Sequence, residues 1–132
     1  MNTIDERLKG RGILIVDDDS RNMFALLSYL DEREMKIYTA GDGFQAMELL
    51  DNHGKIDLIL MDMMMPEMDG YETIGRIRNN QPTAGIPIIA VTAKAMKGDR
   101  EKCLEAGASE YVSKPVNMQE LLKKMADMLK PV

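Results

Sequence analysis

Short runs of apolar residues alternate with longer amphipathic segments along most of the chain. The runs lie at residues 13–16, 37–40, 58–61, 88–91 and 111–112. The first, third and fourth runs are apolar at every position, which is typical of strands that are covered on both faces. The pattern therefore predicts a parallel sheet with helices on each side.

The segments between the runs carry the signals of helices. Met23, Leu26 and Leu30 belong to one apolar stripe at helical spacing. Asp19 or Ser20 is expected to cap that helix. Three further N-caps are each followed by a polar residue three positions later, in the pairs Asp42 with Gln45, Asp69 with Glu72, and Asn117 with Glu120. Gly107 suits the left-handed backbone conformation that often ends a helix. The alternation of strands and helices predicts one α/β domain with right-handed crossovers.

Composition narrows the class of protein. A length of 132 residues suits one domain, and a net charge of -5 without a basic block argues against direct binding to nucleic acid. The single cysteine, Cys103, fits a reducing compartment. The charged first dozen residues lack a signal peptide, and no apolar run approaches the length of about 20 residues that spans a bilayer. We therefore expect a cytoplasmic domain that does not bind membranes.

Polar residues that could bind a ligand or take part in a reaction follow four of the apolar runs. They are the triplet Asp17, Asp18 and Asp19, then Asp62, Thr92 and Lys114. Because the carboxyl ends of parallel strands meet at one edge of a sheet, these side chains are expected to share a pocket. Carboxylates, a hydroxyl and an ammonium together suit a divalent cation, such as Mg²⁺, and a phosphoryl group.

Each of these residues also has an ordinary structural explanation. The acidic triplet alone suits a solvated turn or a helix cap, Thr92 alone suits a strand, and Lys114 alone suits the surface. Asp62 is harder to explain in this way, because burying an unpaired carboxylate is costly. Pairing with Lys114 would lower that cost and is compatible with a chemical role. Solvated positions are expected for His53, Arg76, Arg78, Lys123 and Lys124.

The order and spacing of the motifs resemble the receiver domain of two-component response regulators. The matching elements are Val16-Asp17-Asp18, Met61-Asp62 with Met65-Pro66 and Met68-Asp69-Gly70, Val91-Thr92-Ala93, Gly107-Ala108, and Tyr111-Val112-Ser113-Lys114-Pro115. Residues 8–12, 17–22 and 92–100 look like receivers of hybrid sensor histidine kinases. The resemblance implies a flavodoxin-like (βα)5 domain at residues 12–130 after an N-terminal extension at 1–11, with a five-stranded parallel sheet in the order 2-1-3-4-5.

The resemblance also implies a role for each residue of the site. Asp62 would be the phosphoacceptor, and Lys114 and Thr92 would contact the phosphoryl oxygens. Tyr111 would be a rotameric switch residue, and the Lys114–Pro115 peptide bond would be cis. Asp19 would not bind the metal directly, and would at most support the metal ligands or cap the helix that follows. Mg²⁺, or alternatively Mn²⁺, would be bound by Asp17, Asp18, Asp62 and the backbone carbonyl of Met64.

The function implied by the resemblance is that of a switch. Asp62 would take a phosphoryl group from a sensor histidine kinase or a histidine phosphotransfer protein, whose choice would depend on the helix at residues 21–30. Phosphorylation would then change the surface formed by residues 97–106 and 109–129, in a monomer or in a homodimer formed through that surface. The protein would be no enzyme beyond assisting its own phosphorylation and dephosphorylation, in which Met64 and Lys94 would flank the route of the attacking water.

Three alternatives follow from the same residues. A haloacid-dehalogenase-type phosphatase would use Asp17 as its nucleophile with Asp19, although Arg21 departs from that pattern and no downstream acidic pair is evident. A flavodoxin-like FMN carrier would need a phosphate loop of another charge and more than 5% aromatic residues. A receiver-like interaction module that is never phosphorylated would not need the complete set of acid, threonine and lysine.

Overall fold

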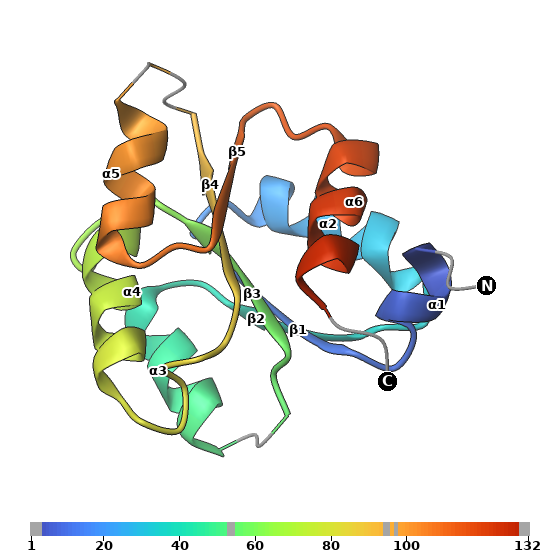
Figure 1. Cartoon of the computed structure of the whole chain (residues 1–132), viewed down its shortest axis with the longest axis horizontal. Helices are drawn as coiled ribbons and strands as arrows, with labels where there is room; N and C mark the ends of the chain where they lie inside the picture. Colours follow the sequence, from blue (N-terminus) through green and yellow to red (C-terminus); the bar gives the residue numbers. More distant parts are fainter. Residues whose placement is uncertain (1–3, 53–54, 94–95, 97, 130–132) are drawn as a thin grey trace.

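A five-stranded parallel sheet forms the centre of the computed structural model, which describes residues 4–52, 55–93, 96 and 98–129 (Figure 1). The strands are β1 (Gly12–Val16), β2 (Lys36–Ala40), β3 (Leu58–Asp62), β4 (Ile88–Thr92) and β5 (Glu110–Ser113). They lie in the order β2-β1-β3-β4-β5, and every pairing is parallel. The predicted fold class and strand order are confirmed.

Helices cover both faces of the sheet. They are α1 (Ile4–Leu8), α2 (Ser20–Asp31), α3 (Gly43–Asn52), α4 (Gly70–Asn79), α5 (Asp99–Ala106) and α6 (Met118–Met128). Helices α1, α2 and α6 lie on one side, and α3, α4 and α5 lie on the other (Figure 1). Among the described residues, no helix has the length and apolar content needed to cross a membrane.

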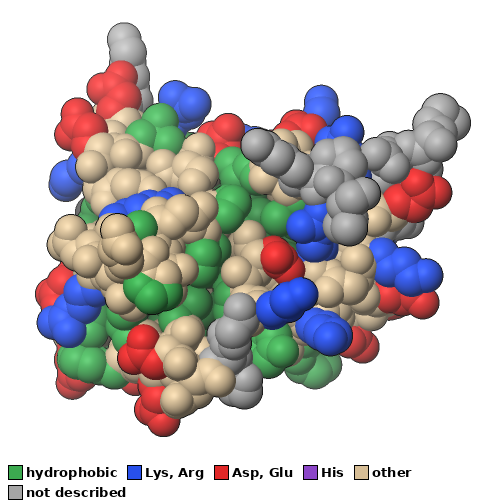
Figure 2. Space-filling view, turned by 60° about the horizontal axis from the view of Figure 1, so that its bottom comes forward, with side chains coloured by type: hydrophobic (Ala, Val, Ile, Leu, Met, Phe, Trp, Pro, Cys, Tyr) green, Lys and Arg blue, Asp and Glu red, His purple; other side chains and the backbone are tan. Residues whose placement is uncertain are grey.

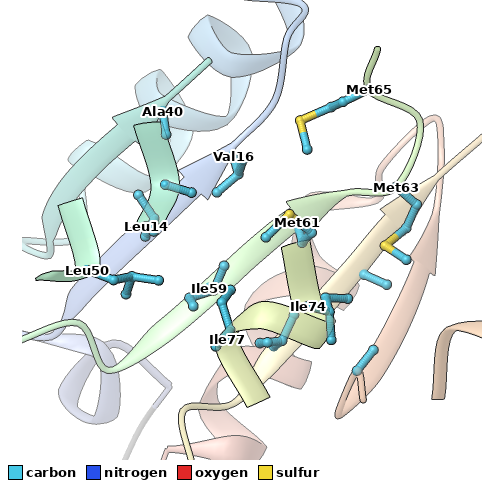
Figure 3. Close-up of a cluster of buried hydrophobic side chains, with 14 of the residues drawn as sticks. Leu14, Val16, Ala40, Leu50, Ile59, Met61, Met63, Met65, Ile74 and Ile77 are labelled. Carbon is cyan, nitrogen blue, oxygen red and sulfur yellow. The ribbon is translucent and has the colours of Figure 1, made fainter. Parts of the chain in front are cut away.

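The sheet separates two apolar clusters, because successive side chains of a strand point to opposite faces. On one face, Leu14 of β1 and Ile59 of β3 pack with Ile74 and Ile77 of α4 (Figure 3). On the other face, residues such as Ile13 of β1 pack with α2 and α6. Strands β1, β3 and β4 are buried along their whole length, whereas the edge strand β2 is partly exposed. The continuous apolar runs reflect this double coverage.

The predicted helix ends are largely confirmed. The side chains of Asp42, Asp69 and Asn117 each accept a hydrogen bond from the backbone N–H three residues later, at 2.8, 2.9 and 3.0 Å. Asp19, rather than Ser20, caps α2, because its carboxylate accepts from the backbone N–H of Arg21 at 2.9 Å. Gly107 follows α5 in the left-handed region, with φ of 118°.

The first described helix, α1, packs against α6. Leu8 is completely buried in the cluster that also contains Met125, and Arg7 Nη1 donates to the carbonyl of Ala126 at 3.4 Å. Helix α1 therefore belongs to the layer formed by α2 and α6 and leads directly into β1. The predicted domain boundary at residue 12 stays a prediction.

Candidate functional site

Three carboxylates meet where β1 and β3 end. One oxygen from each of Asp17, Asp18 and Asp62 lies within 4.8 Å of the others. The sheet brings them together, because β1 and β3 are neighbours and Val16 pairs with Met61 in their register. Asp17 and Asp62 are each 3% exposed, whereas Asp18 is exposed to solvent. Two acids of the site are thus buried and the third is open to solvent.

Lys114 is the cation that faces this acidic cluster. Its Nζ lies 3.6 Å from Asp62 Oδ1 and 3.7 Å from Asp17 Oδ2. The Lys114 backbone N–H donates to the carbonyl of Thr92 at 2.8 Å, which ties the end of β5 to the end of β4. The Lys114–Pro115 peptide bond is cis, as the resemblance implies. The pairing of Asp62 with Lys114, which the sequence left open, is therefore present.

The charges of the site do not balance. Burial, followed by the nearby charge of Asp17, raises the pKa of Asp62, while the Met64 N–H and Lys114 act in the opposite direction. Burial and the neighbouring Asp62 raise the pKa of Asp18. Among the described residues, three carboxylates face one ammonium, which favours an additional cation, and an oxygen-only donor set suits a hard ion such as Mg²⁺. These residues therefore fit a divalent metal.

The loop after β3 holds the Asp62 carboxylate in place. The backbone N–H of Met64 donates to Asp62 Oδ1 at 3.0 Å, and the Met64 side chain is 50% exposed. Helix α4 packs directly on this loop, since a Cβ on Gly70 would lie 2.6 Å from Met63 Cα and 2.7 Å from the carbonyl oxygen of Asp62. This close approach requires glycine at the start of α4.

Thr92 lies on β4, the neighbour of β3, and Tyr111 lies on β5, one strand further away. Thr92 is the last residue of β4 and is 2% exposed, and its neighbour Val91 pairs with Asp62. Tyr111 is half-buried on β5, where it pairs with Ala90, and burial raises the pKa of its hydroxyl. Thr92 therefore lies at the edge that carries the acids, while Tyr111 lies further back along the sheet.

The remaining residues singled out from the sequence fall outside this cluster. The Asp19 carboxylate faces the first turn of α2, where Arg21 Nε lies 3.9 Å away. His53, Lys94, Lys97 and residue 130 lie outside the described residues. Arg76 and Lys123 are exposed, as expected.

Two basic residues that were expected to be solvated, Arg78 and Lys124, instead donate hydrogen bonds to backbone carbonyls, so the expectation for them was wrong. Arg78 is partly buried and donates to three backbone carbonyls, those of Ala84, Ile86 and Gly107. Lys124 Nζ donates to the carbonyl of Tyr111 at 3.0 Å. The spacing contained one signal, because Arg78 follows the buried Ile74 by four residues and so continues the same helix face.

A hollow of about 220 Å³ adjoins the cluster between α2 and the segment after β5. Asp17, Asn22 and Lys114 are its polar lining residues, and the rest of the lining is apolar, with contributions from Ala25, Leu26, Pro115, Val116 and Met118. Phe24, also on α2, is 71% exposed. The acidic cluster is thus bordered by apolar surface on the α2 side.

Comparison with known protein families gives one match over most of the chain. Residues 13–126 match the family model of the response regulator receiver domain. The match contains all of the residues assigned to the site, and it supports the receiver interpretation rather than the phosphatase alternative at Asp17.

Curated relatives include a transcriptional regulatory protein and a hybrid histidine kinase. The chain is 41% identical over 119 residues to the transcriptional regulatory protein CpxR of Escherichia coli K12, covering 89% of this chain and 49% of that protein. It is 42% identical over 111 residues to the hybrid signal transduction histidine kinase I of Dictyostelium discoideum, covering 80% of this chain and 6% of that protein. The chain therefore spans about half of the first relative and a small part of the second.

Solved structures agree with this relationship. The receiver domain of the response regulator Ssk1 from Saccharomyces cerevisiae, solved with the histidine phosphotransfer protein Ypd1, superposes with a TM-score of 0.85 at 29% identity. The alignment covers 92% of this chain and 90% of that one. The predicted resemblance, including that to hybrid kinases, is confirmed.

Proposed function

The chain belongs to the response regulator receiver domain family, whose members are phosphoacceptors of two-component signalling, and we propose that Asp62 is its phosphoacceptor. One observation carries this assignment. Asp62 ends the central strand β3, between the acids that follow β1 and Thr92 at the end of β4, and it is buried and paired with Lys114. Asp17 is also buried and paired with Lys114, but it follows β1, which is not a neighbour of the strand that carries Thr92. A carboxylate fixed in this way is oriented for attack, whereas Asp18 is open to solvent.

The reaction transfers a phosphoryl group from a phosphohistidine of the partner. An oxygen of Asp62 forms a bond to phosphorus while the bond between phosphorus and the imidazole nitrogen breaks, and the imidazole leaves with that electron pair. Lys114 neutralises charge on one phosphoryl oxygen, and the Thr92 hydroxyl donates to another. Backbone N–H groups at Met64 and Ala93 complete the contacts. Positioning and charge neutralisation are the main contributions of a protein to such a transfer.

The acidic cluster supplies the metal site of this proposal. Asp17, Asp18, Asp62 and the backbone carbonyl of Met64 would hold Mg²⁺, with Mn²⁺ as an alternative. When bound, the ion would neutralise negative charge on the carboxylate and phosphoryl oxygens. The proposal is supported by the three converging carboxylates and by the raised pKa values of Asp18 and Asp62.

The consequence of phosphorylation is a shift between two conformations. Thr92 moves toward the phosphoryl group, and Tyr111 turns into the space that Thr92 vacates. This change alters the surface of α5, β5 and α6, which we call the output face, in a monomer or in a homodimer formed through that face. A phosphoryl group adds charge at one point and biases an equilibrium that already exists.

The partner is a sensor histidine kinase or a histidine phosphotransfer protein that docks beside α2. The apolar hollow next to Lys114 and the exposed Phe24 support this location. Direct binding to nucleic acid is not part of the proposal, because the net charge is -5 and both signs of charge are interspersed on the face seen in Figure 2. We place this function in the cytoplasm and in a domain at residues 12–130.

Labelling with acetyl phosphate tests the assignment. We expect wild-type protein to incorporate acid-labile phosphate with Mg²⁺, and Asp62→Asn to incorporate none. Peptide mapping after borohydride reduction identifies the labelled aspartate. Label on Asp17 would favour the phosphatase alternative, and label that persists in Asp62→Asn would refute the proposal. A chelator should stop labelling, so an unchanged rate would exclude the metal role.

A further inference from the structure

The Arg78 side chain connects the end of α4 with the loop before β4 and with the distant junction between α5 and β5. From the last turn of α4, its Nε donates to the carbonyl of Gly107 at 2.9 Å, and Nη2 donates to Ser109 Oγ at 3.3 Å. Its Nη1 donates to the carbonyls of Ala84 and Ile86 at 2.9 and 2.6 Å. The guanidinium therefore joins the C-terminal end of α5 to α4 and to the loop before β4.

Other contacts hold the same end of α5. The backbone N–H of Ala108 donates to the backbone carbonyl of Cys103 at 3.0 Å. The Ser109 N–H donates to the carbonyl of Ile88 at 2.7 Å, and the Ile88 N–H donates to Ser109 Oγ at 3.1 Å. A Cβ on Gly107 would lie 2.9 Å from Arg78 Cγ, so helix and side chain are in direct contact. The junction between α5 and β5 is thus fixed to the scaffold by several bonds.

Among the described residues, the N-terminal end of α5 makes mainly local contacts. The helix begins after Gly98 without a side-chain cap, Asp99 exchanges hydrogen bonds of 2.9 and 3.0 Å with the backbone of Met96, and Cys103 is the buried residue of the helix. Arg100 pairs with Glu110 at 3.8 Å, but the arginine is 59% exposed, and exposed ion pairs contribute little. Lys102 lies 5.7 Å from the Tyr71 ring, near the middle of the helix. The two ends of α5 are therefore held unequally.

We propose that Arg78 makes the C-terminal end of α5 a fixed pivot, so that phosphorylation swings the N-terminal end of this helix. The inference rests on the proposed function, in which Thr92 of β4 starts the change. A helix of eight residues is about 12 Å long, so a rotation of about 10° displaces its free end by about 2 Å. Arg78 thereby converts a small change at the site into a directed movement of the output face.

Hydrogen exchange without any ligand tests the anchor. Arg78→Met removes the four hydrogen bonds, and Arg76→Met is a matched control, because Arg76 lies on the same helix, is exposed and pairs with Glu72 alone among the described ion pairs. We expect amides at residues 106–110 to exchange about tenfold faster in Arg78→Met and unchanged in Arg76→Met. Arg78→Lys, which keeps the charge but not the planar fork, should fall between them. Equal exchange in both methionine variants would overturn the anchor.

Exchange with beryllium fluoride and Mg²⁺, as a phosphoryl mimic, tests the pivot. In the wild type we expect exchange to change at residues 98–103 and to stay within twofold at 106–110, whereas in Arg78→Met the change should extend to 106–110. A wild-type change of equal size at both ends would overturn the pivot. No response at either end, with Asp62→Asn as the reference, would contradict the proposed function, while the measurement without ligand still decides the anchor.

Discussion

Lys114 and Asp62 form an ion pair across the end of β4, with 3.6 Å between Nζ and Oδ1. Lys114 directly follows β5, which is not a neighbour of β3, so the lysine side chain reaches over the end of the intervening strand β4. Its side chain is 22% exposed, which limits screening by solvent. The pair therefore places a cation where a phosphoryl group on Asp62 would carry its charge.

We expect Lys114→Met to slow labelling by acetyl phosphate about a hundredfold, because one preorganised charge partner is lost. The initial rate of phosphate incorporation measures this effect. Lys123→Met is the control, since Lys123 is exposed on α6. A rate within twofold of the wild type would show that Lys114 does not assist the transfer.

Asp62→Asn should stabilise the protein when no cation is bound. Because burial raises the pKa of Asp62, the folded state binds more protons than the unfolded chain between the two pKa values, and stability falls as pH rises through that window. We expect the variant to melt about 5 °C higher than the wild type at pH 7 with a chelator. Near pH 3, where the carboxyl is mostly protonated in both states, the difference should be small.

Thermal unfolding followed by circular dichroism checks this expectation. Asp51→Asn removes the same charge from an exposed position and should change little. Added MgCl₂ should raise the melting temperature of the wild type and have a smaller effect on Asp62→Asn. An Asp62→Asn variant that melts below the wild type at pH 7 would contradict the predicted increase in stability.

Gly70→Ala should disturb the site, whereas Gly75→Ala should not. An alanine Cβ at position 70 would meet the backbone of Asp62 and Met63, while nothing lies within 4 Å of a Cβ at position 75. We expect the first change to cost about 1–3 kcal/mol and to slow labelling. The second should stabilise the protein by up to about 1 kcal/mol. Urea unfolding and labelling rates measure both effects, and equal effects at the two positions would exclude a role for the close approach.

A polar side chain at position 64 should shorten the lifetime of the phosphorylated protein. Met64 is half exposed and adjoins the Asp62 carboxylate, so an asparagine there can hold a water molecule near the acyl phosphate. We expect Met64→Asn to hydrolyse several-fold faster, with little change in stability. Met96→Asn, at a residue that is 77% exposed, is the control. An unchanged decay of labelled protein would show that position 64 does not set the rate.

Leu8→Ala should destabilise the fold without affecting the chemistry. The Leu8 side chain is completely buried against the layer of α2 and α6, so its truncation should cost about 2–4 kcal/mol. Urea denaturation measures this cost, and the labelling rate at 20 °C should stay at the wild-type value. A cost below about 0.5 kcal/mol would indicate that residues before 12 are dispensable for the fold.

The sheet and the acidic cluster could be predicted because both depend on local sequence patterns. A run such as residues 58–61 is apolar throughout only if both faces are covered, and the polar residue that follows it must then lie at the sheet edge. Strand order came from the family resemblance rather than from any pattern in the residues. Asp17 and Asp62 were therefore placed correctly once β1 and β3 were neighbours.

The contacts of Arg78 and Gly70 could not be predicted in the same way. Arg78 donates hydrogen bonds to backbone carbonyls up to 29 positions away. Because every residue has a backbone carbonyl, the sequence does not indicate which of them will accept. The sequence around Gly70 indicates only the start of a helix, and the need for glycine follows from the close approach of the Asp62 and Met63 backbone. Asp19 and Ser20 are both good caps, and the choice depends on where the loop after β1 turns.

The two apolar clusters lie on opposite faces of the sheet and have no residue in common. Energetic coupling between substitutions decays when side chains share no partner, so changes in α2 should be close to additive with changes in α4 or α5. The face beside which a partner docks can then diverge without repacking the layer that contains α5. A double-mutant cycle with Leu26→Ala and Ile77→Ala should give a coupling energy below about 0.5 kcal/mol. The architecture thus allows the input specificity of such a domain to evolve separately from much of its output.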